Sequence, residues 1–163
     1  MSGALPVGPI TIDVNRAAGA WPEEAKMDDL VRRAIGAAVD AARPALAAGS
    51  ELSVMLTDNA AMRALNARWR GTDKATNVLA FPQDGGPMLG DIVLAFETVR
   101  EEAALANKPL EHHIAHLIIH GFFHIIGYNH ADDRQANAME TLERAALSCL
   151  GIADPHRPAC PSS

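Results

Sequence analysis

The segment Leu110–Ile126 constrains the fold of this chain more than any other, because it is apolar on nearly every side of a helix. Its large apolar residues are distributed around the whole helical circumference: Ile114, Leu117, Ile118, Ile119, Phe122, Phe123, Ile125 and Ile126. A helix of this kind is stable only when other elements bury it. The sequence therefore predicts a central helix here, and Gly127 is placed to end it.

Hydrophobic patterns before this helix predict elements that could cover it. Alternating apolar residues indicate strands over 10–14 and 52–56, and an apolar stripe that follows Pro22 predicts a helix between them. Strands joined through a helix form a right-handed crossover with parallel strands when they share a sheet. Asp58 is placed to cap a short helix, and four residues of that helix are expected to face inward or towards a cleft: Met62, Leu65, Asn66 and Trp69.

The remaining patterns complete an α+β fold. Strands over 76–81 and 92–96 are expected to pair antiparallel, because the link between them is short and contains Gly and Pro. Further helices are expected over 97–106, 110–126 and 132–150. The prediction is a single domain over residues 1–152, with a small mixed sheet of about four strands packed with about five helices. Residues 153–163 contain three prolines and are expected to be a flexible C-terminal tail.

Composition limits the classes of function. With 163 residues the chain suffices for one well-buried core, and its apolar stretches are broken before membrane-spanning length. The N-terminus lacks a secretory pattern and two cysteines do not suggest a disulfide framework, so a cytoplasmic protein is expected. The net charge of −6 opposes general binding to polyanions. A nucleic-acid partner would require a local basic patch.

The central helix carries histidines at a spacing typical of metal ligands. His120 and His124 lie one helical turn apart, so both imidazoles project from the same face. His130 follows the expected turn at Gly127 and can supply a third ligand. Three protein ligands leave a position for water, which is the catalytic arrangement of zinc. The alternative is that these are ordinary core histidines, but burying several unpartnered imidazoles is costly. We therefore predict one divalent ion, zinc, on a central metal-binding helix.

The other histidines and one glycine refine this hypothesis. His116, one turn earlier, could orient a ligand, shuttle a proton or be a satisfied core residue, whereas three histidines are expected at the solvated surface: His112, His113 and His156. The ligand spacing is also that of zinc peptidases, in which a Glu after the first histidine serves as general base. Here that position is Gly121, which weakens a peptidase interpretation.

Three motifs resemble the YbeY family of bacterial rRNA maturation factors, which are metal-dependent endoribonucleases. His120–His130 resembles the family's His-Gly-x-x-His-x-x-Gly-Tyr-Asp/Asn-His signature, with Asn129 where Asp is usual. The block 65–82 is similar to a second family motif, although Trp69 stands where Tyr is common and Ala80 where Ser is common. The third motif is Leu89-Gly90-Asp91-Ile92-Val93. The resemblance extends from about Ile10 to Pro155.

This resemblance implies a function. It implies a zinc-like ion on the three histidines, cleavage of single-stranded RNA near the 3′ end of small-subunit rRNA, and association with the small ribosomal subunit and its proteins in ribosome assembly and quality control. Arg70 matches the arginine regarded as functionally essential in the family. The Asn129 change puts in doubt any supporting role of a carboxylate beside His130.

The residues around Arg70 independently suggest an RNA contact. Arg63, Arg68, Arg70 and Lys74 have only Asp73 as an acidic counterweight in their stretch. Arg63 and Lys74 are expected to be solvated, while Arg70 could bind a phosphate bidentately. The expected mechanism is attack on phosphorus by a metal-activated water, with the metal and Arg70 stabilising the developing charge.

The sequence leaves the general base open, with three candidates: His116, Asp91 or a hydroxide on the metal. Two alternative functions also remain. One is a ribosome-assembly binding protein with a structural metal, and the other is a small zinc peptidase-like hydrolase.

Overall fold

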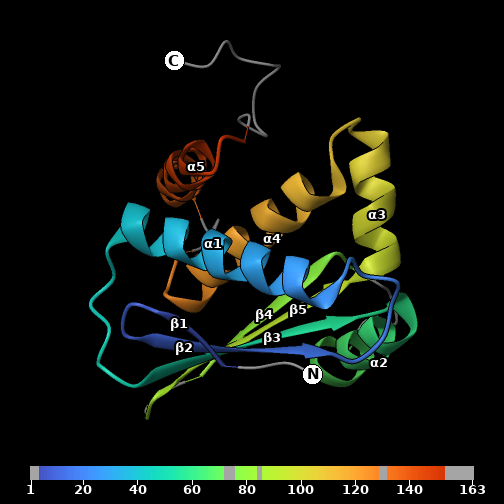
Figure 1. The fold of residues 1–163 in the computed structure, drawn as a ribbon, viewed down its shortest axis with the longest axis horizontal. Coiled ribbons are helices and arrows are strands. Elements are labelled where there is room, and N and C mark those ends of the chain that lie inside the picture. Colours follow the sequence, from blue (N-terminus) through green and yellow to red (C-terminus); the bar gives the residue numbers. More distant parts are fainter. Residues whose placement is uncertain (1–3, 72–75, 84–85, 129–131, 153–163) are drawn as a thin grey trace.

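The computed structural model describes residues 4–71, 76–83, 86–128 and 132–152, which form the strands and helices shown in Figure 1. The strands are β1 (Ala4–Val7), β2 (Ile10–Arg16), β3 (Ser50–Thr57), β4 (Val78–Pro82) and β5 (Met88–Ala95). The helices are α1 (Glu24–Ala42), α2 (Asn59–Arg70), α3 (Phe96–Leu105), α4 (Leu110–Ile125) and α5 (Asp133–Cys149). Among these helices none is both long and apolar enough to cross a lipid bilayer.

The described strands form one mixed sheet in the order β1-β2-β3-β5-β4. Strands β2 and β3 are parallel neighbours joined through α1, and β4 pairs antiparallel with β5, as predicted. The sequence analysis did not predict β1, which is short, contains Pro6 and turns into β2 through Gly8, whose φ is 58°. Proline is tolerated at this place because β1 is an edge strand. The α+β class with a small mixed sheet is confirmed, with one additional strand at its edge.

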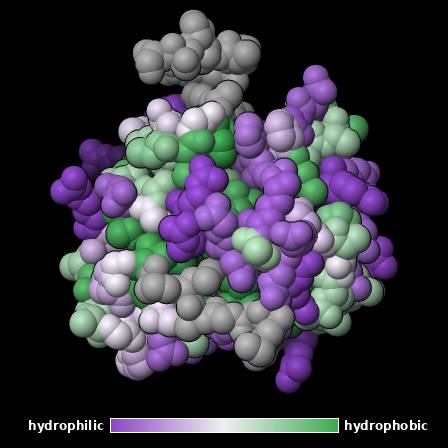
Figure 2. Space-filling view, in the orientation of Figure 1, coloured by the Kyte–Doolittle hydropathy of each residue, from purple (hydrophilic) through white to green (hydrophobic). Residues whose placement is uncertain are grey.

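Helix α4 lies at the centre of the main core, as its all-round apolar character predicts. It packs against α1, α3, α5 and the sheet, and its buried side chains include Phe122 and Phe123, which are both fully enclosed. Figure 1 shows α1, α3, α4 and α5 together on one side of the sheet. Hydrophilic side chains gather over the middle of the same view in Figure 2, where α1 turns its outer side to solvent.

Helix α2 covers the opposite face of the sheet at the β4–β5 edge. The side chain of its N-cap residue, Asp58, accepts a hydrogen bond from the Ala61 backbone N–H at 2.9 Å, as predicted. A second, smaller core lies beneath the helix and comprises Met62, Leu79, Val93 and Ala95. For Trp69 the inward alternative was wrong, because this side chain is 63% exposed. Leu65 and Met62 already fill the inward side of the helix, and Trp69 is left at its outer side.

Candidate metal centre and its cleft

Two of the three predicted ligands converge on one point. His120 and His124 project from the same side of α4, and their Nε2 atoms lie 3.1 Å apart. Two nitrogens bound at about 2.0–2.1 Å to a tetrahedral zinc ion are roughly 3.3 Å apart. The pair therefore fits a shared ion with only a small adjustment of the two side chains.

A buried glutamate on α5 orients this pair. Glu143 is 1% exposed, and its Oε2 accepts a hydrogen bond from His120 Nδ1 at 2.7 Å. With its proton on Nδ1, His120 presents the lone pair of Nε2 towards His124. Metal-binding histidines commonly donate their other ring N–H to a carboxylate in this way. The chemistry of the donor set thus fits a divalent ion.

Glu143 is charged in this environment. Burial raises the pKa of the Glu143 carboxyl, but the hydrogen bonds and charges of His116 and His120 outweigh burial and hold the pKa well below its usual range. The sequence analysis missed this residue. A signal was available, since Glu143 shares the inward stripe of α5 with three apolar residues: Met139, Ala146 and Leu147. A lone carboxylate on such a stripe requires a partner in the core.

His116 lies behind the pair. Its Nε2 is 3.0 Å from the second oxygen of Glu143, Oε1, and the residue does not belong to the described lining of the cleft that contains His120 and His124. This position suits a group that supports Glu143 or relays a proton.

The cleft beside the two histidines has a volume of about 560 Å³. It lies between α4 and the edge strand β4, and its described lining comprises Asn77, Val78, Leu79, Ala80, Pro82, His120, Gly121, His124, Gly127 and Tyr128. Since consecutive residues of β4 contribute to the lining, the cleft includes the outer edge of this strand. An extended chain could lie there beside the histidines.

Gly121 lies where α4 packs tightly against the sheet. A Cβ atom at this position would lie 3.1 Å from Ile92 Cγ2 and 3.5 Å from Val78 Cγ2. The contact with Ile92 is tighter than an ordinary van der Waals contact, so a glutamate here, such as the general base of the zinc peptidases, would require Ile92 to shift. The packing therefore gives a physical reason for the glycine and argues further against the peptidase alternative.

Several predicted site residues lie outside the described part of the chain. They are His130, the third predicted ligand, together with Asn129, Asp73, Lys74 and His156. Within the described residues, no cluster of three or more His, Cys, Asp or Glu side chains is arranged to hold a metal ion.

Arg70 and Asp91 belong to the part of the molecule on the α2 side of the sheet, opposite the side covered by α4. Arg70 is the last residue of α2, and its side chain is outside the description. Asp91 pairs with Phe81 across the β4–β5 ladder, on the face that α2 covers, and its Oδ2 accepts a hydrogen bond from Gln83 at 3.1 Å. The described geometry therefore does not bring Asp91 to the histidine pair, and strand β4 lies between the end of α2 and the cleft.

The prediction of a solvated His113 was wrong. This residue is 8% exposed, because α3 packs against α4, and its Nε2 donates to Glu102 Oε1 at 2.9 Å. The same oxygen accepts a hydrogen bond from Asn77 Nδ2 at 3.0 Å. Burial lowers the pKa of His113, although the hydrogen bond to Glu102 opposes the shift. Glu102 thus connects α3 and α4 to Asn77 at the rim of the cleft.

Comparison with known proteins decides the family. A family model described as Endoribonuclease YbeY matches residues 14–151. The chain belongs to the endoribonuclease YbeY family. The resemblance seen in the sequence motifs is thereby confirmed, and so is the prediction that the chain comes from a family of RNA-cleaving hydrolases.

Curated members of the YbeY family match along almost their whole length. Endoribonuclease YbeY of Rhodopseudomonas palustris (strain BisB18) is 47% identical over 157 residues, which cover 91% of this chain and 93% of the relative. Endoribonuclease YbeY of Rhizobium meliloti (strain 1021) is 45% identical and covers 90% and 95%, respectively. A protein from Thermotoga maritima solved in solution has 19% identity and a TM-score of 0.55, covering 89% of this chain and 99% of its own. This last likeness concerns the fold alone.

Proposed function

We propose that this protein is a metal-dependent endoribonuclease that cuts single-stranded RNA and acts near the 3′ end of small-subunit rRNA during ribosome maturation. The observation that carries the proposal is the convergence of His120 and His124 in an open cleft, with Glu143 oriented behind them, in a member of an endoribonuclease family. The proposed unit is one domain over residues 1–152, and the family match from residue 14 to residue 151 supports it.

The proposed cofactor is one zinc ion held by His120, His124 and His130. When bound, such an ion lowers the pKa of water and withdraws charge from a phosphoryl oxygen. The chain's own groups prepare the site: Glu143 holds the His120 ring with its Nδ1 proton pointing away from the cleft, and His116 supports Glu143. His116 is also the proposed group for moving a proton, which it would exchange through Glu143 rather than with the substrate.

The proposed role of Arg70 is to bind a phosphate of the RNA strand. A guanidinium matches the geometry of phosphate oxygens, and Arg70 ends a helix next to strand β4, whose outer edge lines the cleft. A strand that crosses this edge could contact Arg70 and the metal centre together. An unpaired strand is the expected substrate because it can bend across the edge.

Two alternatives are weaker. A ribosome-assembly protein with a structural metal would be expected to enclose its ion, because structural zinc sites are closed, whereas His120 and His124 line an open cleft. A peptidase would need its general base at the position of Gly121, where even an added Cβ atom would lie only 3.1 Å from Ile92 Cγ2. The proposed compartment is the cytoplasm, and the proposed partners are rRNA and the small ribosomal subunit with its proteins.

Cleavage of a labelled single-stranded RNA by purified protein tests the proposal. We expect cleavage to stop after chelation and to return with added zinc. His124→Ala should abolish both tight zinc binding and cleavage, whereas Arg70→Ala should retain zinc and lose about a hundredfold in rate, with partial rescue by Arg70→Lys. Cleavage that is unaffected by chelation, or an intact RNA at every metal concentration, would contradict the proposed function.

A further inference from the structure

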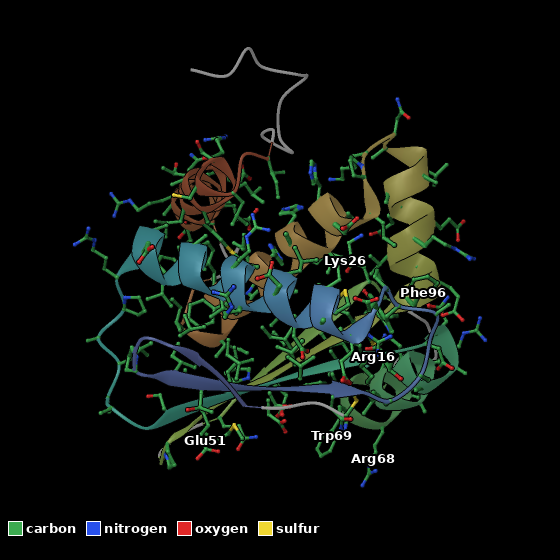
Figure 3. All side chains as sticks on the ribbon, viewed as in Figure 1. Arg16, Lys26, Glu51, Arg68, Trp69 and Phe96 are labelled. Carbon is green, nitrogen blue, oxygen red and sulfur yellow. The ribbon has the colours of Figure 1, made fainter. Side chains whose placement is uncertain are left out.

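The outer surface of α2 carries an aromatic ring that the metal centre does not explain. Trp69 is 63% exposed, whereas Trp21 is 6% exposed and donates its indole N–H to backbone oxygens of Ala18 and Thr57. Among the described residues, the large apolar side chains that are exposed are Trp69 and Leu105. Figure 3 shows Trp69 together with Arg68 at the lower edge of the molecule, away from α1.

Positive charge surrounds this ring. The guanidinium carbon of Arg68 lies 5.4 Å from the centroid of the Trp69 ring, which is a cation–π distance. Helix α2 contains Arg63, Arg68 and Arg70 but no acidic residue, although the whole chain has a net charge of −6. Within the described residues neither Arg63 nor Arg68 forms an ion pair. The surface of α2 is therefore a local basic patch with an exposed aromatic ring at its end.

The ring is also next to the cleft. The centroids of the Trp69 and Phe81 rings are 6.4 Å apart, and Phe81 belongs to β4. The neighbours of Phe81 on this strand, Ala80 and Pro82, line the metal cleft on the other face of the sheet. Trp69 and the cleft thus lie on two sides of the same short stretch of edge strand.

We propose that Trp69 and Arg68 form a stacking site for an unpaired nucleobase of the RNA strand that enters the cleft across the edge of β4. The proposal rests on the proposed function and extends it, because it identifies where a base next to the cleavage site binds. Exposed aromatic rings combined with basic side chains bind single strands by stacking and by contacts to phosphate, largely without regard to base identity. The ring would hold the base, while the basic side chains of α2 accompany the backbone.

The test uses the zinc-loaded protein and a short, labelled single-stranded 2′-deoxy oligonucleotide, which resists an endoribonuclease but retains its bases for stacking. Titration should quench the fluorescence of the exposed Trp69, while the buried Trp21 contributes a constant background. Trp69→Ala should weaken binding by about tenfold or more, and Trp69→Phe should retain most of the affinity. Leu105→Ala is the matched control, since it removes the other exposed apolar side chain, and it should bind like the parent.

Salt dependence separates stacking from charge. Trp69→Ala should leave the slope of log affinity against log salt unchanged, because stacking releases no counterions, whereas Arg68→Ala should reduce the magnitude of this slope by about 0.7 for one lost phosphate contact.

If the parent cleaves RNA while Trp69→Ala binds the oligonucleotide as tightly as the parent, the stacking site is wrong and the proposed function stands. If Trp69→Ala loses association with the small ribosomal subunit but keeps its affinity for the oligonucleotide, the ring contacts a protein and the proposal is overturned. A parent that neither binds nor cleaves single-stranded RNA would overturn both proposals.

Discussion

At the scale of the residue, Glu143 explains how partly buried histidines can be accommodated in a helix as apolar as α4. Its two oxygens are bound to His116 and His120, so one buried carboxylate satisfies polar groups that would otherwise face a hydrocarbon core. The same hydrogen bond selects the tautomer of His120 that directs Nε2 towards His124. The same side chain thus supports both the packing of α4 and the proposed metal site.

We expect Glu143→Gln to weaken zinc binding by about tenfold to a hundredfold, since a neutral amide is a poorer acceptor for His120 Nδ1–H and holds the ring less firmly. The measurement is the zinc dissociation constant of the purified variant in competition with a chelator of known affinity. Glu140→Gln is a suitable control, because Glu140 lies on the same helix and is only 3.8 Å from Arg144 in a partly exposed ion pair. Equal zinc affinity in the parent and Glu143→Gln would show that the carboxylate does not tune the site.

At the scale of the element, the sequence predicts what local periodicity encodes. The crossover of β2, α1 and β3 and the central position of α4 follow from their apolar patterns, and the convergence of His120 and His124 follows from helical spacing. Local periodicity does not predict the hydrogen-bond partners of the histidines. Glu143 and Glu102 reach them from α5 and α3, and the pairing depends on how these helices pack.

The packing of α3 on α4 predicts a dependence of stability on pH. Burial lowers the pKa of His113 below its ordinary value of 6.5, while Glu102 opposes the shift and the charges of Lys108 and His116 reinforce it. Above about pH 6.5 the residue is neutral in both the folded and the unfolded chain, and its contribution to stability is fully present. As the pH falls, the unfolded chain takes up the proton first, so stability is lost until the pH passes the pKa of the folded state.

Chemical unfolding of metal-free protein over a pH series measures this effect. In the parent, the free energy of unfolding should fall as the pH drops below 6.5, and in His113→Gln this fall should be less steep. The two slopes should differ by at most about 1.4 kcal/mol per pH unit, which is the limit for the uptake of one proton. Metal-free protein is used so that the competition between protons and zinc does not contribute. His112→Gln, at the adjacent and more exposed position, should follow the parent. An unchanged slope in His113→Gln would mean that this residue binds protons equally in both states.

At the scale of the whole molecule, an acidic protein is proposed to act on a polyanion. The net charge of −6 disfavours an extended RNA-binding surface, and the basic residues of the proposed contact are concentrated in α2 and the residues that follow it: Arg68, Arg70 and Lys74. Intrinsic affinity for RNA should therefore be weak. Selection of the correct RNA would then depend on docking to the small ribosomal subunit rather than on many phosphate contacts.

This distribution of charge predicts a shallow salt dependence and a preference for unpaired RNA. The slope of log affinity against log salt should be about −2 to −3, because only a few phosphates are neutralised. A short single strand should bind more tightly than its duplex, since an unpaired backbone can bend across the edge of β4 into the cleft, whereas an A-form duplex is stiff. Binding of both forms over a salt series, measured with metal-free His124→Ala and metal-loaded parent protein side by side, separates contacts at α2 from contacts at the metal. A slope near that of a protein with eight phosphate contacts, or tighter binding of the duplex, would contradict a local patch that leads to one metal centre.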